Sequence, residues 1–140
     1  MRIPVRLKRV IAIAVLGLLL SPLPTLAHHS FSAMYDVKKY VVLNGTLAEV
    51  MFRNPHIWVF IDVPGDGSSV TWGCEGANPN SLFRRGWRPE LLKVGESVTM
   101  EGYAARNGKP LCNLRNLVTA DGKKMFVGAV NDGAPAVPTP

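Results

Sequence analysis

The chain has 140 residues, with 16 Lys and Arg against 10 Asp and Glu, and a formal net charge of +6. Four of the basic residues and no acidic residue lie within positions 1–27, so the remaining 113 residues carry 12 basic and 10 acidic side chains, a net charge of +2. That length suits one small domain with one core. No basic run is interleaved with aromatic residues, which argues against nucleic acid as a partner.

Residues 1–27 have the pattern of a secretory signal peptide. Four basic residues open the segment, an apolar run follows over Val10–Leu20, and the small residue Ala27 stands where a signal peptidase would cut. The apolar run is shorter than the roughly 20 residues of a transmembrane helix. We therefore expect an exported bacterial protein, periplasmic or secreted, with no membrane span after cleavage.

Cleavage after Ala27 would make His28 the first residue of the mature chain. A histidine at a free amino terminus offers its α-amine and its ring nitrogen together, and imidazole sites bind Cu(II) most tightly among the divalent first-row metals. His29 follows directly, and His56 is the one other histidine of the sequence. The sequence predicts a copper site at His28, His29 and His56. The alternative is a mobile chain end with exposed histidines and a His56 that bonds to a turn carbonyl.

Most of the remaining chain predicts β-strands. The clearest strand is 56–63, where Ile57, Val59 and Ile61 alternate with Trp58 and Phe60. Gly45, inside the first apolar run, predicts a bulge or a sharply coiled strand. Further strands are expected at 40–52, 70–75, 97–106 and 111–119, with a short last one at 124–127.

The order of these elements favours one fold. A short helix is expected to start in 78–81, with Asn80 or Ser81 as its cap, and to end at Gly86. Three strands, a helix and two strands predict an all-β domain over 28–130, a small five-stranded OB-like Greek-key barrel with one short helix between strands 3 and 4. A β-sandwich is the alternative. Residues 131–140 are rich in Pro, Ala and Gly and predict a disordered tail.

The two cysteines, Cys74 and Cys112, fall on the third and fifth predicted strands. These strands are neighbours in the OB order, and an exported protein enters an oxidising compartment. A disulfide is therefore one expectation, if the two Cβ atoms converge. Two buried free thiols, which behave as small apolar side chains, remain the other.

A second group of residues predicts a ligand or interaction site. Its polar and aromatic members surround the predicted helix and the strand before it: Asn54, Trp58, Glu75, Asn78, Arg84, Arg85 and Trp87. Two arginines near a helix start suit an anion, and Trp58 with Phe60 suits an apolar contact unless residues 31–35 cover them. The alternative is structural, with an arginine paired to Glu75 and Trp87 closing one end of the barrel. No nucleophile–base motif or phosphate loop is visible, so no enzyme is predicted.

Four segments, HHSFSAMYD, LNGTLAEVMFRNPHIWVFIDV, WGCEGANPNSLFRRGW and LKVGESVTMEGY, resemble a widespread family of small secreted bacterial proteins that contain a domain of unknown function. The resemblance spans about residues 28–127. It implies a periplasmic location and an OB-like barrel, and it supplies no established activity. The positions that fall on the family's pattern are His28, His29, Asn54, His56, Glu75, Arg85, Gly86 and Trp87. Cys74 and Cys112 are not part of it.

The sequence thus predicts an exported periplasmic OB-fold binding protein whose partner is a small ligand or a transition metal, with copper preferred. The alternative is an interaction module that contacts an envelope protein and needs no metal.

Overall fold

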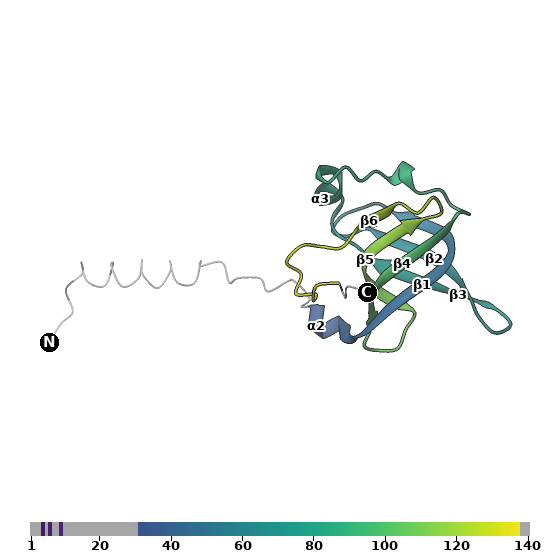
Figure 1. The fold of residues 1–140 in the computed structure, drawn as a ribbon. Helices are drawn as coiled ribbons and strands as arrows, with labels where there is room; N and C mark the ends of the chain where they lie inside the picture. Colours follow the sequence, from purple (N-terminus) through teal and green to yellow (C-terminus); the bar gives the residue numbers. More distant parts are fainter. Residues whose placement is uncertain (1–3, 5, 7–8, 10–30, 138–140) are drawn as a thin grey trace.

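The computed structural model describes residues 4, 6, 9 and 31–137 (Figure 1). His28, His29 and most of the predicted signal segment, residues 1–27, lie outside the described residues. In the part of the chain that is described, no helix is long and apolar enough to cross a membrane.

The described chain is mostly β, which confirms the predicted class at that level. Its elements are α2 (Phe31–Met34), β1 (Tyr35–Met51), β2 (Trp58–Pro64), β3 (Ser69–Glu75), α3 (Pro79–Arg84), the 3-10 helix η1 (Pro89–Leu91), β4 (Ser97–Ala105), β5 (Leu111–Thr119) and β6 (Lys124–Phe126). The expectation of five strands is corrected to six in one sheet, because β6 pairs with β5 from Asn116 to Val118.

The strand order in the sheet is β3-β2-β1-β4-β5-β6, and each of these neighbours is antiparallel. One further pairing joins strands that are distant in this order. β3 runs parallel to β5, with Cys74 opposite Cys112 and Glu75 opposite Asn113. A disulfide links the two cysteines, whose Cα atoms are 4.4 Å apart, and both side chains are fully buried.

The long strand β1 pairs with both β2 and β4, and it must bend to do so. Its second half pairs with β2 and its middle pairs with β4, so both neighbours meet near Thr46. A Cβ atom on Gly45 would lie 2.5 Å from the carbonyl oxygen of Asp62, so only glycine allows this close crossing. The register shift itself lies further along, between Leu47 and Glu49.

The alternation predicted for β2 is confirmed by burial. Ile57, Val59 and Ile61 are completely buried in the core, whereas Trp58 and Phe60 on the opposite face are half-buried. Since partners across an antiparallel pair point to the same side, Glu75, opposite Trp58, also lies on the outer face of the sheet.

Both ends of the described chain cover part of that outer face. Phe31 and Tyr35 form a buried aromatic cluster with Tyr103 of β4, separate from the main core. Residues 131–137, for which the composition predicts disorder, also contact the domain: Asp132 pairs with Arg115 at 3.0 Å, and the Tyr103 hydroxyl donates to the Ala136 carbonyl. Figure 1 shows this segment beside α2.

One carboxylate ties four strands together. Glu101 of β4 accepts hydrogen bonds from Tyr40, Asn116 and Lys124, which belong to β1, β5 and β6. Burial alone would raise the pKa of Glu101, but these three donors and the Lys124 charge outweigh it and lower that pKa. Burial, followed by the Glu101 charge, raises the pKa of Tyr40 to about 12, so the phenol stays a donor.

We expect Glu101→Gln to lower the free energy of unfolding by about 2 kcal/mol at pH 7. A depressed folded-state pKa contributes stability above the unfolded value of 4.5, and that contribution is lost as the pH falls through the folded-state value. The gap between wild type and variant in urea unfolding should therefore close on acidification. A gap that stays constant to pH 3 would contradict this assignment.

The Cys74–Cys112 disulfide closes a loop with a sequence separation of 38. Loop-closure entropy gives such a link about 4 kcal/mol of stability. We expect Cys74→Ala/Cys112→Ala to lose at least that much in urea unfolding, because two core side chains are also truncated. Since both sulfur atoms are buried, dithiothreitol without denaturant should leave the bond intact. Rapid reduction in the folded protein would show that the β3–β5 edge opens readily.

Candidate functional site

His56 stands between the cis Asn54–Pro55 peptide and the start of β2. Its Nδ1 lies 3.1 Å from the Gly76 carbonyl oxygen. A carbonyl only accepts, so Nδ1 carries the proton in this bond and Nε2 keeps its lone pair. The side chain is 38% exposed, so a ligand from solvent can reach the ring.

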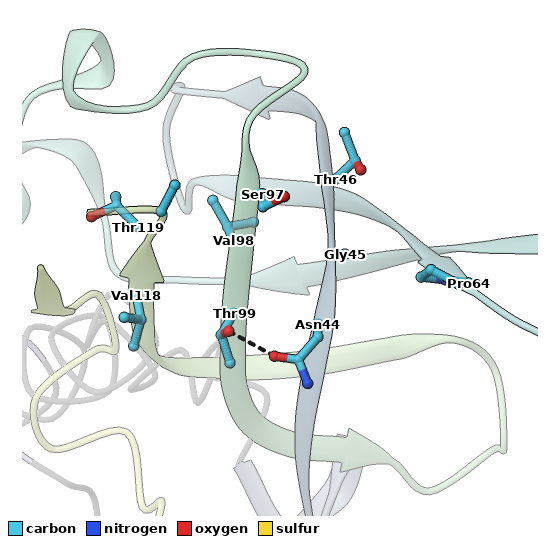
Figure 2. A pocket seen from close by; sticks show the side chains of 10 residues that line it. Asn44, Gly45, Thr46, Pro64, Ser97, Val98, Thr99, Val118 and Thr119 are labelled. Atoms are coloured by element: carbon cyan, nitrogen blue, oxygen red, sulfur yellow. Dashed lines mark hydrogen bonds between the residues drawn. The ribbon is translucent and has the colours of Figure 1, made fainter. Parts of the chain in front are cut away.

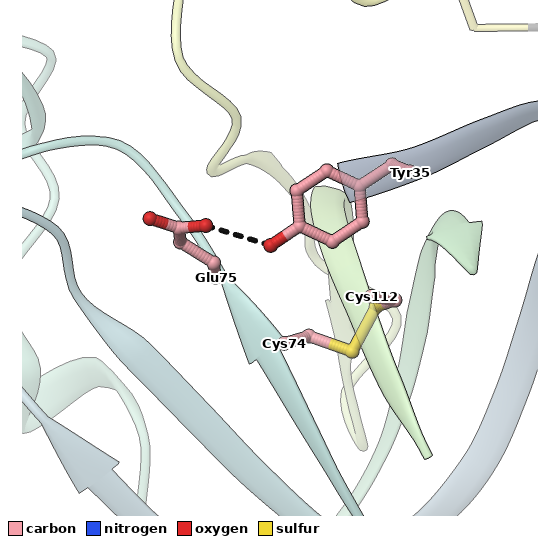
Figure 3. Close-up of a disulfide and its surroundings, with 4 residues drawn as sticks. All are labelled: Tyr35, Cys74, Glu75 and Cys112. Carbon is pink, nitrogen blue, oxygen red and sulfur yellow. Dashed lines mark hydrogen bonds between the residues drawn. A yellow bond between two sulfur atoms is a disulfide. The ribbon is translucent and has the colours of Figure 1, made fainter. Parts of the chain in front are cut away.

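Glu75 lies beside the same ring nitrogen. Its Oε1 is 3.7 Å from His56 Nδ1, and its Oε2 accepts a 2.6 Å hydrogen bond from the Tyr35 hydroxyl (Figure 3). The carboxylate is mostly buried, with 18% of its side chain exposed. The fold therefore brings together His56 and Glu75, two of the positions that fall on the family's pattern.

Tyr35 also belongs to this site, although the sequence indicated residues 31–35 only as a possible cover for Trp58 and Phe60. It is 4% exposed, so burial is the largest cause that raises the pKa of its phenol, and the hydrogen bond to Glu75 raises it further. The hydroxyl therefore remains protonated at any physiological pH and always donates to the carboxylate. The partners are 40 residues apart in sequence, and only the fold shows that they meet.

The backbone fixes Glu75 from two sides. It pairs with Trp58 of β2 and with Asn113 of β5, and the residue before it forms the disulfide with Cys112. Cys74 points into the core, so Glu75 points outward. The carboxylate therefore stands on a rigid strand end.

A pair of aromatic rings borders the site. Trp58 and Phe60 are stacked with centroids 6.2 Å apart and an interplanar angle of 20°. Phe60 lies over Gly73, where a Cβ atom would come within 2.7 Å of the ring. Because Trp58 is opposite Glu75, the aromatic pair and the carboxylate share one face of the sheet.

The predicted helix cap is wrong by two or three residues. The cap is Asn78, whose side chain accepts from the Ser81 backbone N–H at 2.8 Å, and not Asn80 or Ser81. Pro79 explains the shift. It suits the first helical position and keeps the residue before it extended, as the Asn78 φ of −69° and ψ of 150° show.

Arg85 is bound to the protein's own carbonyls. It donates to the carbonyl oxygens of Ser81 and Gly128, and its guanidinium lies over the Phe126 ring at 5.3 Å. The expected ion pair to Glu75 does not form in the described structure, since Glu75 contacts Tyr35 and His56. The arginine therefore fastens α3 to the chain after β6.

Trp87 is 3% exposed and stacks on Phe52 with ring centroids 5.3 Å apart, so it belongs to the core. Arg84 and Asn54 are exposed, and neither side chain makes a hydrogen bond or ion pair within the described residues. Of the second predicted group, Glu75 contacts His56, and Trp58 lies opposite Glu75 in the β2–β3 pair.

A pocket of about 420 Å³ lies where β1, β4 and the end of β5 meet (Figure 2). Thr99 donates to the Asn44 side chain at 2.7 Å inside it. All of its lining residues are neutral: Asn44, Gly45, Thr46, Pro64, Ser97, Val98, Thr99, Val118, Thr119 and Ala120. Such a lining offers neither metal ligands nor an acid–base pair, which leaves the His56 site as the better candidate.

Within residues 31–137, no three His, Cys, Asp or Glu side chains form a group that could hold a metal. His56 is one donor with Glu75 behind it, and both cysteines are in the disulfide. The other two histidines of the sequence, His28 and His29, lie outside the described residues.

A protein-family model, described as a family of unknown function (DUF6152), matches residues 17–113. The match runs from the predicted signal segment into β5, and it confirms the resemblance drawn from the HHSF, NPH and RRGW segments. No curated protein matches the chain.

Two adjacent arginines give a matched stability test. We expect Arg85→Ala to lower the free energy of unfolding by about 1–2 kcal/mol, because the carbonyl oxygens of Ser81 and Gly128 each lose a donor. Arg84→Ala should change it by less than about 0.5 kcal/mol. Thermal and urea unfolding of both variants measure the difference, and equal effects would remove the assigned role of Arg85.

Proposed function

The chain belongs to this family of unknown function, and we propose that it is an exported periplasmic binding protein that takes copper at His56. The other donors are the amine and ring of His28, created by cleavage after Ala27, together with His29. The protein carries no catalytic group in this proposal.

The proposed fold is an OB-like Greek-key barrel. The pairings β1–β2, β2–β3, β3–β5, β5–β4 and β4–β1 lead back to the starting strand, which supports closure of the sheet by five strands. The short helix α3 lies between strands 3 and 4, as an OB-like order requires. β6 then extends the sheet beyond the five.

The bond from His56 Nδ1 to the Gly76 carbonyl is the observation that carries the metal proposal. Metal-binding histidines usually donate their second ring nitrogen to a backbone carbonyl or a carboxylate, which fixes the tautomer and the ring. His56 has the carbonyl at 3.1 Å and the Glu75 carboxylate at 3.7 Å on that side. Its exposed Nε2 is thereby prepared to bind a metal.

The anchoring of the N-terminal segment supports the remaining donors. Phe31 packs on Tyr35, Tyr35 bonds to Glu75, and Glu75 lies against His56. Two residues lie between His28 and Phe31, and an extended chain covers about 11 Å in the three residue steps from one to the other. In this proposal the donors of a mature N-terminus therefore start within that reach of Phe31, whose segment is anchored to Glu75 through Tyr35.

A second candidate is an interaction module for an envelope protein. The half-buried pair Trp58 and Phe60 favours it, since stacked aromatic side chains are frequent at protein interfaces. Trp87 no longer supports it, because the core buries that ring.

Copper titration of the signal-cleaved protein tests the first proposal. We expect one Cu(II) equivalent to bind tightly, and a glycine inserted before His28 to weaken binding at least 100-fold, because the amine then leaves the chelate. His56→Ala should weaken it about 10- to 100-fold. Thr46→Ala, in the neutral pocket, serves as the control and should change nothing. Nanomolar binding that survives both changes at the site would contradict this proposal.

A further inference from the structure

We propose that the surface under residues 131–137 is a binding site for an extended, acidic segment of a partner protein. In this structure the chain's own tail occupies the surface in place of that partner (Figure 1). We call it the tail site, and it is formed by Tyr103 of β4 with Asn113 and Arg115 of β5. The proposal goes beyond copper binding and does not depend on it.

Arg115 is a buried cation whose carboxylate partner comes from the tail. Only 8% of its side chain is exposed, and its Nη1 lies 3.0 Å from an Asp132 carboxylate oxygen. Nη1 also donates to the Ala129 carbonyl at 3.1 Å, and the guanidinium lies over the Phe126 ring at 5.0 Å. Charged side chains are almost never buried without a partner. The domain therefore holds a guanidinium that requires a carboxylate.

The backbone of β5 presents Arg115 through a bulge. Asn116 pairs with Glu101 of β4, and Leu114 pairs with the next residue, Gly102. Arg115 is thus an extra residue with no partner on β4, and bulges of this kind re-aim a side chain and are frequent beside binding sites. A buried ion pair by itself adds little to stability, because removing two charges from water offsets most of the attraction. Recognition of a carboxylate explains this arrangement better than stability does.

The tail does not satisfy all the polar groups of the tail site. Asn113 is 8% exposed, and its Nδ2 donates to Asp132 at 3.4 Å. Its buried Oδ1 and the buried Nε of Arg115 have no hydrogen-bond partner within the described residues. Unpaired buried polar atoms cost free energy. A partner segment that brings an N–H group and a second acceptor besides the carboxylate would therefore fit this site better than the tail.

The tail shows which form of segment the site accepts. Asp132 and Ala134 are half-buried, whereas the residues between and beside them are exposed, which is the alternation of an extended chain. Ala134 packs against the aromatic cluster of the N-terminal segment, and the Ala136 carbonyl accepts from the Tyr103 hydroxyl at 3.1 Å. The occupant is thus a carboxylate, a small side chain two residues later and a backbone carbonyl two residues after that.

Few contacts hold the tail, so a partner can replace it. No backbone–backbone hydrogen bond joins residues 131–137 to the rest of the described chain. The polar contacts to the domain come from the Asp132 carboxylate and the Ala136 carbonyl. Segments with so few contacts open without unfolding of the domain. A tethered tail competes at an effective concentration on the order of 1 mM, so removing its carboxylate should open the site to a free peptide.

The experiment measures peptide binding to the full signal-cleaved chain in excess chelator, so that no metal contributes. The probe is the peptide of residues 131–137, NDGAPAV, acetylated and amidated so that Asp132 supplies its one carboxylate. In an NMR titration, we expect the Asp132→Asn chain to bind this peptide at least tenfold more tightly than wild type, with shifts at Asn113 and Arg115. The same peptide with Asn in place of aspartate should not bind. Tyr103→Phe, added to Asp132→Asn, should weaken binding about three- to tenfold.

Asp66→Asn is the matched control, because Asp66 is an exposed carboxylate in the turn after β2. It should bind the peptide no better than wild type. A folded Asp132→Asn chain that does not bind the peptide would overturn the proposal. Self-association of wild type that Asp132→Asn abolishes would also overturn it, since the occupant would then be a second copy.

Hydrogen exchange of the wild-type chain gives a test that needs no variant. We expect the tail amides, such as that of Ala134, to exchange at least about 100-fold faster than the amide of Leu114 in β5. Tail amides that exchange only with global unfolding would overturn the proposal, because the tail would then be a fixed part of the domain. Neither result bears on copper binding at His56.

Discussion

The parallel contact between β3 and β5 is the constraint on which the candidate site depends. β3 is the outermost strand of the antiparallel order, and this contact joins it to the far side of the sheet. The buried Cys74–Cys112 bond fixes the register at that point. Glu75 is the next residue after Cys74. Its carboxylate meets the hydroxyl of Tyr35, which begins β1 and pairs with Ala105 of β4.

Two tyrosine–carboxylate pairs lie in this fold, and their surroundings separate their roles. Glu101 has Tyr40, Asn116 and Lys124 as donors, so a cation neutralises it and its function is to join strands. Glu75 receives a neutral phenol and stands beside a histidine. The two carboxylates therefore share a tyrosine donor but differ in their surroundings, since Glu101 pairs with a lysine and Glu75 with a histidine.

Sequence reasoning reached the strands and the core of this protein because period-2 alternation is a local signal. The alternation of Ile57, Val59 and Ile61 along the chain is enough to predict that these side chains are buried, without any knowledge of the fold. The Asn78 cap was also a local property, and Pro79 was the signal that could have located it. The bond between Tyr35 and Glu75 was not predictable, since a separation of 40 residues leaves no periodic or spacing pattern.

The contacts of residues 131–137 show that composition alone does not predict whether a segment packs on the domain. A Pro- and Gly-rich segment buries little apolar area, but one ion pair to the buried Arg115 and one carbonyl bonded to Tyr103 suffice to hold it. Its path brings Gly133 against Phe31, where an added Cβ atom would lie 3.7 Å from the Phe31 Cβ.

The position of this segment also affects the charge at the site. Asp132 contributes to the raised pKa of Tyr35, so a second carboxylate acts on the phenol besides Glu75. Arg115 pairs with Asp132 at 3.0 Å. Within the described residues, Glu75 pairs with His56 and accepts from Tyr35. The arginine under the tail thus matters for the site, because it holds the segment whose Asp132 acts on Tyr35.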